Sequence, residues 1–249
     1  METKLPFSEY KRAATQQTKH STDDAPTTSH RRLSIGSILW ILFKAILFSA
    51  LPFIVLIRGA VYLHESQEWM SWLALGGGIL GSAILLLFYL LYWQGRLWGV
   101  SNSLKNVKRT YWLAFVLVLV YCVPGVLYLS ASNAKHSEVQ KEFTSLHPIL
   151  RLGISTLVYL DKELLITDAN RQPEDYAKMG LPTKKHSLHY EQSDGYAHAI
   201  DIRTKGQSEI RNTLIQWYFR LMGFNTLRHV GTADHLHVSL MSHDRPEGI

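Results

Sequence analysis

Three long stretches of apolar residues dominate the first half of the chain. They run from Ser34 to Ile57, from about Trp69 to Trp93, and from Tyr111 to about Leu129. A helix needs roughly 20 residues to cross the hydrocarbon core of a bilayer, and each stretch reaches that length. We therefore predict three N-terminal transmembrane helices, which make residues 33–130 a membrane anchor.

After the third stretch, the pattern becomes that of a small mixed domain over residues 131–249. Apolar residues recur at helical spacing over residues 134–146 and 207–222. Residues 157–167 are typical of a strand, a turn and a second strand, and residues 236–240 alternate as in a strand. Helices and strands in mixed order, without strand–helix–strand repeats, indicate an α+β fold. We expect the aromatic cluster of the second helix to lie in the core: Trp217, Tyr218 and Phe219.

Charge is distributed unevenly between the two halves of the chain. Residues 1–130 hold 12 Lys and Arg against 6 Asp and Glu, and so carry the whole net charge of +6. These cations gather in residues 1–32 and in the loop after the second apolar stretch, whereas the loop after the first has only Arg58. Because Lys and Arg are retained in the cytoplasm, we predict a cytoplasmic N-terminus and an extracytoplasmic domain at residues 131–249.

The same distribution predicts the partners of the first half. Cations that flank apolar stretches are typical of a membrane protein, so we expect a lipid bilayer and no nucleic acid as partner. Residues 1–32 are rich in Ser, Thr, Gln and charge, which predicts a disordered cytoplasmic tail. The lone Cys122 excludes an intrachain disulfide and a zinc site of several cysteines.

Two short segments of the C-terminal region combine histidine with acidic residues. They are SLHYEQSDGYAHAID at residues 187–201 and DHLHV at residues 234–238. Catalytic zinc is held by three nitrogen or oxygen ligands and keeps one open position, with a carboxylate nearby to transfer protons. Residues two apart on a strand share a face, so His235 and His237 can point into one pocket. The candidate metal ligands are His189, His198, Asp201, His235 and His237, with Asp234 beside them.

Three motifs resemble one known superfamily. The run SLHYEQSDGYAHAIDI is similar to the motif Ser-x-His-x-x-Gly-x-Ala-x-Asp of the D-alanyl-D-alanine peptidases and the hedgehog signalling domain. The His-x-His of DHLHVSL follows a helix and the pair Gly223-Phe224, as in that superfamily. More loosely, TDANRQPEDY at residues 167–176 resembles its segment with a substrate-facing arginine. Together these motifs cover roughly residues 145–240.

This resemblance implies a fold, a cofactor and a role for each matching residue. It implies a domain of the hedgehog/DD-peptidase type that holds one Zn²⁺ through His189, Asp201 and His237. Ser187 would support this site, and Arg171 would orient the substrate carboxylate. The catalytic residues would then be Arg171, His235 near the developing oxyanion, and Asp234 as the general base.

The implied activity is that of a membrane-anchored zinc peptidase. Its substrate would be a peptidoglycan stem peptide, cut by a D,D- or L,D-type carboxypeptidase or endopeptidase. It would be a multi-pass protein of the bacterial inner (cytoplasmic) membrane, with its C-terminal domain in the periplasm. The alternative is a membrane-tethered zinc-binding recognition or signalling domain without strong catalysis.

Two departures from the superfamily pattern leave alternatives open. The ligand histidine and aspartate are seven positions apart in the superfamily, whereas His189 and Asp201 are twelve apart, so either the loop is longer or His198 replaces His189. Asp234 stands where the peptidases carry glutamate, and it faces His237 only if the backbone bends at residues 233–234. Without that bend, Glu191 and Asp194 are the alternative bases. The remaining histidines are expected to be solvated or at helix ends: His147, His186, His229 and His243.

Overall fold

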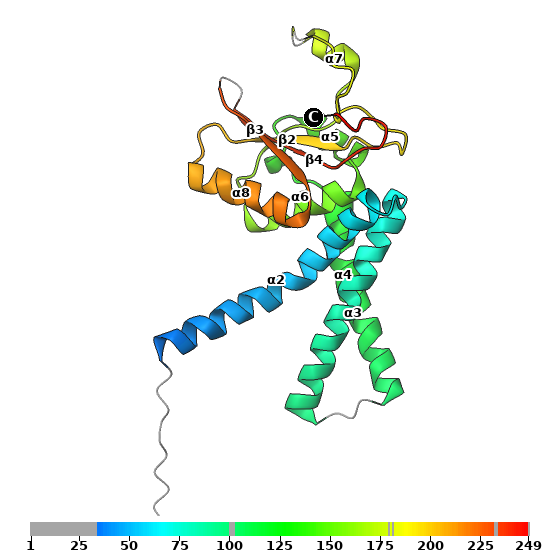
Figure 1. The fold of residues 1–249 in the computed structure, drawn as a ribbon, viewed down its shortest axis with the longest axis vertical. Coiled ribbons are helices and arrows are strands. Elements are labelled where there is room, and N and C mark those ends of the chain that lie inside the picture. Colours follow the sequence, from blue (N-terminus) through cyan, green and yellow to red (C-terminus); the bar gives the residue numbers. More distant parts are fainter. Residues whose placement is uncertain (1–33, 100–102, 179, 181, 232–233, 249) are drawn as a thin grey trace, which may run out of the picture. The chain divides into compact units, whose positions relative to one another are not determined.

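The computed structural model describes residues 34–99, 103–178, 180, 182–231 and 234–248 (Figure 1). The chain forms two compact units, residues 1–45 and residues 46–249. The described part of the first unit is the beginning of helix α2, and the rest of the described chain belongs to the second unit. The predicted disordered tail, residues 1–32, lies outside the described residues.

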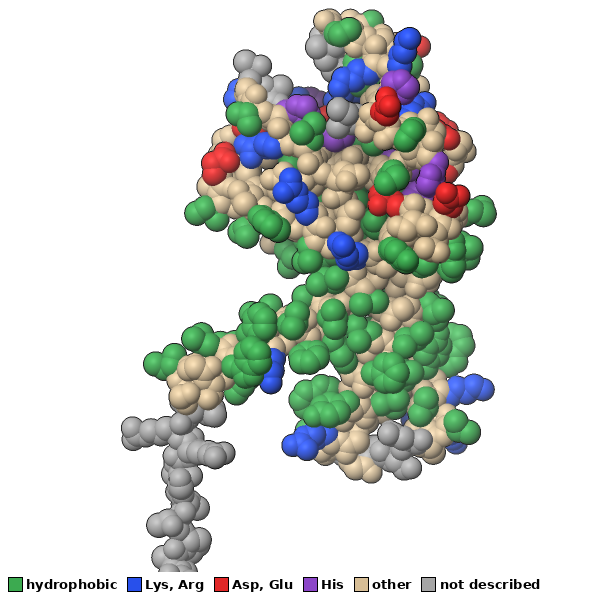
Figure 2. Space-filling model, in the orientation of Figure 1, with side chains coloured by type: hydrophobic (Ala, Val, Ile, Leu, Met, Phe, Trp, Pro, Cys, Tyr) green, Lys and Arg blue, Asp and Glu red, His purple; other side chains and the backbone are tan. Residues whose placement is uncertain are grey.

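Three long apolar helices confirm the predicted membrane-spanning elements. They are α2 (Ile35–Glu65), α3 (Ser71–Trp98) and α4 (Leu104–Leu127), and their most apolar windows have mean hydropathies of 2.3, 2.1 and 2.1. Hydrophobic side chains cover the outer surface of α3 and α4, and Lys and Arg gather where the two helices join (Figure 2). The length and composition of these helices therefore associate the protein with a membrane.

Small residues let α2 and α3 approach closely. A Cβ atom added at Gly78 would lie 2.2 Å from the carbonyl oxygen of Leu56 and 3.0 Å from Cβ of Ala60. The hydroxyl of Ser82 donates to the carbonyl oxygen of Pro52 at 3.0 Å, across the same contact. Helix packing in a membrane uses small residues in this way, since there is no hydrophobic force to bring the helices together.

A four-stranded antiparallel sheet forms the centre of the C-terminal region, as expected for an α+β fold. The strands are β1 (Ile166–Asp168), β2 (Ala199–Arg203), β3 (Asn225–His229) and β4 (His235–Ser239), in the order β1-β2-β4-β3. The short segments that connect to the sheet are η1 (Ala131–Asn133), α5 (Ser137–Glu142), η2 (Phe143–Ser145) and α7 (Pro173–Lys178). The predicted helix over residues 134–146 is therefore shorter and ends in a 3-10 turn.

Helix α6 (Pro148–Leu160) corrects the first of the two strands predicted within residues 157–167, whereas the second overlaps β1. It begins at Pro148, because proline suits the first turn of a helix, and it buries 11 of its 13 residues. Arg151 donates to the carbonyl oxygen of Val126 at 3.0 Å, and Ser155 donates to that of Gly125 at 2.6 Å. Helix α6 therefore packs as a largely buried helix against α4, and one core continues from the long apolar helices into the sheet.

Helix α8 (Glu209–Met222) packs beside α6 on one side of the sheet (Figure 1). Ser208 caps it by accepting from the backbone N–H of Arg211 at 3.3 Å. It buries Phe219, as predicted, but Trp217 is 63% exposed, so the prediction that Trp217 lies in the core is wrong. The helix has two apolar faces, and only one of them meets the sheet.

Candidate metal centre

The two faces of the sheet have different chemistry. In the register of β2 and β4, Ile200 pairs with Val238 and Ile202 with Leu236, and these side chains join the core. Between them, Asp201 pairs with His237. Because side chains alternate along a strand, Asp201 and His237 point to the opposite face, away from the core.

On that face, three donor atoms converge on one point. Nδ1 of His237 lies 2.9 Å from Oδ1 of Asp201, and Nε2 of His189 lies 3.3 Å from the same oxygen. One donor atom from each of the three residues lies within 4.8 Å of the others, and all three side chains are buried. A tetrahedral ion with bonds of 2.0–2.1 Å holds its ligands about 3.3 Å apart, so this group could hold a metal ion.

The surroundings of His189 fix which of its nitrogens faces Asp201. Nδ1 lies 2.9 Å from the carbonyl oxygen of Ala169, and a carbonyl can only accept, so Nδ1 carries the proton. The backbone N–H of His189 donates to Oγ of Ser187 at 3.3 Å. Ser187 therefore supports the position of His189, and the lone pair of Nε2 faces the Asp201 carboxylate. Two acceptors face each other there, and a bound cation would satisfy both.

The electrostatics of Asp201 and His237 also favour the protonation states that bind a metal ion. Burial acts to raise the pKa of Asp201, but His189 and His237 hold it well below its usual value. Burial lowers the pKa of His237, although Asp201 opposes this. An ionised carboxylate and a neutral imidazole are the forms that ligate metals. Among the described residues, Nε2 of His237 has no hydrogen-bond partner.

Arg171 holds the other side of the Asp201 carboxylate. Its Nη2 donates to Oδ2 of Asp201 at 2.8 Å, and its Nε donates to Oδ2 of Asp168 at 2.5 Å. The guanidinium also lies 5.5 Å from the ring of Tyr176. Arg171 is thus in the site, as the resemblance implies, but two carboxylates already engage it.

A cavity of about 50 Å³ opens at the three converging residues. Its lining is Arg171, Tyr176, Lys184, His189, Asp201, His229, His235 and His237. His229, which was expected to be solvated, pairs with His235 across β3 and β4, and the two rings stack with centroids 4.7 Å apart. Recognition of a hairpin around Gly231 would have placed these two histidines opposite each other.

Asp234 lies outside this lining. Nε and Nη2 of Arg228 donate to its two oxygens at 2.7 and 2.9 Å, and the hydroxyl of Thr204 donates to it at 2.6 Å. These hydrogen bonds lower the pKa of Asp234 to about 2. The backbone bend that would turn Asp234 toward His237 involves Ala233, which lies outside the described residues. Glu191 and Asp194 do not line the cavity either.

The structure brings His189, and not His198, together with Asp201 and His237. His198 belongs to a second group, with His64, His147 and Asp194. The long loop between His189 and Asp201 therefore supplies two members of the second group, Asp194 and His198.

No family model, no curated protein and no solved structure matches the chain. An assignment of function therefore depends on the chemistry of the site, because a site and not a fold carries activity. Its described elements are two buried imidazoles, one carboxylate, a supporting guanidinium and a cavity with two further histidines.

Proposed function

We propose that the protein is a membrane-anchored zinc metallopeptidase that hydrolyses bonds in peptidoglycan stem peptides. The observation that carries this proposal is the convergence of His189, Asp201 and His237 beside a cavity. Two imidazoles and one carboxylate form a donor set of the catalytic type, which leaves one position of a tetrahedral ion open. When bound, zinc supplies Lewis-acid activation of water and of a carbonyl group.

The chain's own residues supply positioning and proton transfer. Arg171 holds Oδ2 of Asp201, which leaves Oδ1 directed at the two histidines. We assign proton transfer to His235, whose Nε2 lies 3.7 Å from Oδ1 of Asp201 and whose ring stacks on His229. Asp234, the base that the resemblance implies, is engaged by Arg228 and has a pKa far below neutrality, which is unfavourable for a general base.

Two features support a peptide substrate with a free carboxylate outside the cytoplasm. Lys184 brings positive charge to the cavity, which suits the C-terminal carboxylate of a peptide and favours carboxypeptidase over endopeptidase activity. The cations at the α3–α4 turn, among them Arg96 and Lys105, favour a cytoplasmic location for that turn. The C-terminal region would then face the periplasm, where stem peptides are found.

The fold is consistent with the resemblance in its local order. Helix α8, the pair Gly223-Phe224, and strands β3 and β4 follow one another and present His237 on the sheet. We propose on this basis that residues 131–249 have the hedgehog/DD-peptidase type of fold. A second candidate function, a zinc-binding recognition domain without catalysis, is favoured by one observation: the carboxylate of Asp234 is paired with Arg228.

The test uses the full chain, purified in detergent, because its core includes α4 as well as the sheet. Zinc content is measured by mass spectrometry, and purified muropeptides are then incubated with the protein. Release of a terminal D-alanine would identify a carboxypeptidase, and loss of cross-links an endopeptidase. His189→Ala and His237→Ala should abolish cleavage, whereas His243→Ala, at an exposed position, serves as the matched control.

The outcomes separate the two candidate functions. Zinc binding without cleavage of any stem peptide would replace the peptidase by the recognition domain. Cleavage that survives His237→Ala would refute the site itself.

A further inference from the structure

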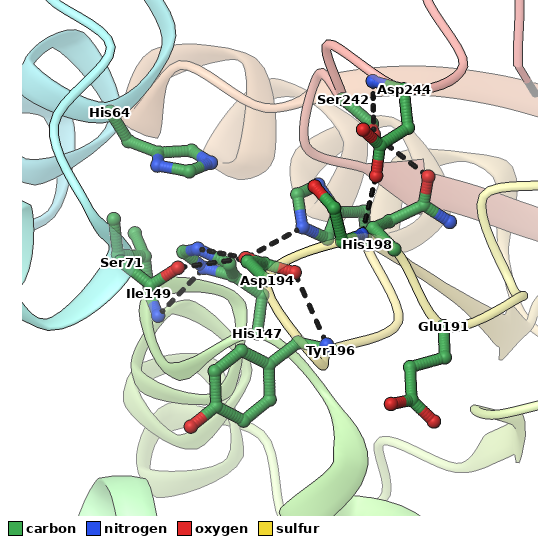
Figure 3. A network of polar contacts seen from close by, with 12 residues as sticks. His64, Ser71, His147, Ile149, Glu191, Asp194, Tyr196, His198, Ser242 and Asp244 are labelled. Carbon is green, nitrogen blue, oxygen red and sulfur yellow. Dashed lines mark hydrogen bonds and ion pairs between the residues drawn. The ribbon is translucent and has the colours of Figure 1, made fainter.

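A second group of histidines lies outside the proposed catalytic site. His64 is in the last turn of α2, His147 precedes α6, and His198 directly precedes β2. Asp194 stands between them (Figure 3). One nitrogen of each histidine and one oxygen of Asp194 lie within 4.8 Å of one another, and the three histidines are buried. No part of the proposed peptidase mechanism uses these residues.

Backbone carbonyls determine which nitrogens face the centre of this group. Nδ1 of His64 lies 2.9 Å from the carbonyl oxygen of Trp69, and Nδ1 of His198 lies 3.0 Å from that of Met241. Carbonyls only accept, so both Nδ1 atoms carry protons and both Nε2 atoms present lone pairs. Nε2 of His198 lies 3.1 Å from Oδ2 of Asp194, and Nε2 of His64 has no hydrogen-bond partner among the described residues.

Nε2 of His198 and Oδ2 of Asp194 are both acceptors, so at 3.1 Å a proton or a metal cation must lie between them. A proton on His198 would satisfy Asp194 but would leave the buried lone pair of His64 without a donor. It would also place a charged ring 4.9 Å from the buried ring of His147. A metal cation satisfies both lone pairs and the carboxylate together, and their spacing suits ligands of a tetrahedral ion.

We propose that His64, Asp194 and His198 form a second metal site, for a divalent cation of the zinc type. Its ligand atoms are Nε2 of both histidines and Oδ2 of Asp194. The site joins the end of a membrane helix to the strand that carries Asp201, so its role is structural: it fastens the sheet to the anchor.

His147 and Ser71 orient the ligands of this site. Nδ1 of His147 accepts from the backbone N–H of Ile149 at 3.3 Å, so its proton lies on Nε2, which faces Oδ2 of Asp194 at 3.5 Å. The hydroxyl of Ser71 donates to the same oxygen at 2.7 Å. An N–H cannot ligate a metal, so His147 lies beside Asp194 without being a ligand in this tautomer.

The experiment counts metal ions in the full chain in detergent. The protein is stripped with a chelator, dialysed against zinc and analysed by mass spectrometry, and Co²⁺ replaces zinc for an absorption spectrum. We expect two zinc ions per chain in the wild type and in the exposed control His243→Ala. His237→Ala should keep one, as should His198→Ala and Asp194→Asn. His147→Asn, which keeps a helix cap, should keep both at saturating zinc but bind the second 10–100-fold more weakly.

The zinc that remains in each variant reports on folding. One ion retained in His198→Ala shows that the other site is intact, and Asp194→Asn repeats the test with a less disruptive change. The second site would be refuted if the wild type bound one ion and only His237→Ala lost it. It would also be refuted if His198→Ala and Asp194→Asn each kept two ions. One ion lost only in His198→Ala and Asp194→Asn would support the second site and refute the proposed catalytic one.

A separate observation concerns the exposed face of α8. Four large apolar side chains recur at helical spacing and are 51–76% exposed: Ile210, Leu214, Trp217 and Leu221. The C-terminal end of this helix lies against α2, because Nη1 of Arg58 donates to the carbonyl oxygen of Leu221 at 2.8 Å. Gly223, whose φ is +101°, allows a close contact there, since a Cβ would lie 3.0 Å from Val61.

From this continuity we infer that the exposed face of α8 lies in the bilayer interface. Amphipathic helices with a large apolar face bind in the membrane interface, and tryptophan favours the headgroup region. The test places a fluorophore at Leu214→Cys in a Cys122→Ala background, in nanodiscs that contain spin-labelled lipids. Quenching should be several-fold stronger than at the exposed control Lys205→Cys. Equal quenching at both positions would overturn the inference.

Discussion

The two histidine–aspartate clusters differ in what surrounds them and in how they are built. The cluster of His189, Asp201 and His237 borders a cavity, and two of its members are cross-strand neighbours in one sheet. The cluster around Asp194 draws on the end of a membrane helix, the start of α6 and a loop, and none of its members lines that cavity. Both clusters offer two imidazoles and one carboxylate as proposed ligands, but only the first borders the cavity. A substrate could therefore reach a bound ion in the first cluster, whereas the second joins the end of α2 to the sheet region.

The partners of the two aspartates show the same difference. Oδ2 of Asp201 is held by the guanidinium of Arg171, a charged group that also lines the cavity. Oδ2 of Asp194 is held by the hydroxyl of Ser71, at the beginning of α3. In the first cluster the support comes from within the sheet region, and in the second it comes from the anchor.

Substitution of the two aspartates should give the largest contrast. Asp201→Asn should reduce peptidase activity by about 10³-fold, because a bound zinc ion would lower the activation barrier by several kcal/mol. Asp194→Asn should keep the first zinc ion but lower the melting temperature of the protein in detergent. Zinc content, cleavage rate and melting temperature of the two variants would be measured together. Equal effects of both variants on cleavage would remove the distinction between the clusters.

A second contrast lies between two neighbouring residues beside the proposed catalytic site, His235 and Asp234. His235→Ala should reduce the turnover number by about 10²-fold, the usual contribution of a proton-transfer group. Asp234→Asn should change it by less than about fivefold, because Arg228 and Thr204 already engage that carboxylate. Steady-state kinetics on one muropeptide would decide. The reverse result would restore Asp234 as the base, with a bent backbone before β4.

Substitution of Arg171 would show whether this side chain positions Asp201 or binds the carboxylate of the substrate. If Arg171 positions Asp201, Arg171→Gln should weaken zinc binding by about 10–100-fold, and Arg171→Lys should weaken it less. Competition with a chromophoric chelator measures this affinity. Unchanged zinc affinity together with a raised Michaelis constant would instead assign Arg171 to the substrate carboxylate, as the resemblance implies.

Sequence patterns predict the first cluster far better than the second. Asp201 and His237 lie on strands, where alternation fixes the face, and the helix and glycine before β3 are local signals. His64 lies between the first two apolar stretches and His147 before a proline, so neither had a local pattern that paired it with His198. The same limit explains why the end of helix α6 was predicted as a strand and why Trp217 was predicted in the core. A run of apolar residues does not reveal what it packs against.

The smallest expected effect is on the pH dependence of stability, through the ion pair between Asp234 and Arg228. The pKa of Asp234, about 2, lies below its unfolded value of roughly 3.9, so its pairing with Arg228 stabilises the fold above about pH 4. This contribution is lost as the pH falls from about 4 toward 2. It amounts to less than about 1 kcal/mol, because the side chain is partly exposed.

Arg228→Gln should therefore reduce the loss of thermal stability between pH 5 and pH 3, measured by melting in detergent. His186→Gln, at an exposed position, controls for the removal of a polar side chain. Identical pH dependence in wild type and Arg228→Gln would mean that the pair does not hold Asp234 in solution. Asp234 would then be available to the cavity, and the cluster would have the carboxylate base that a recognition domain lacks.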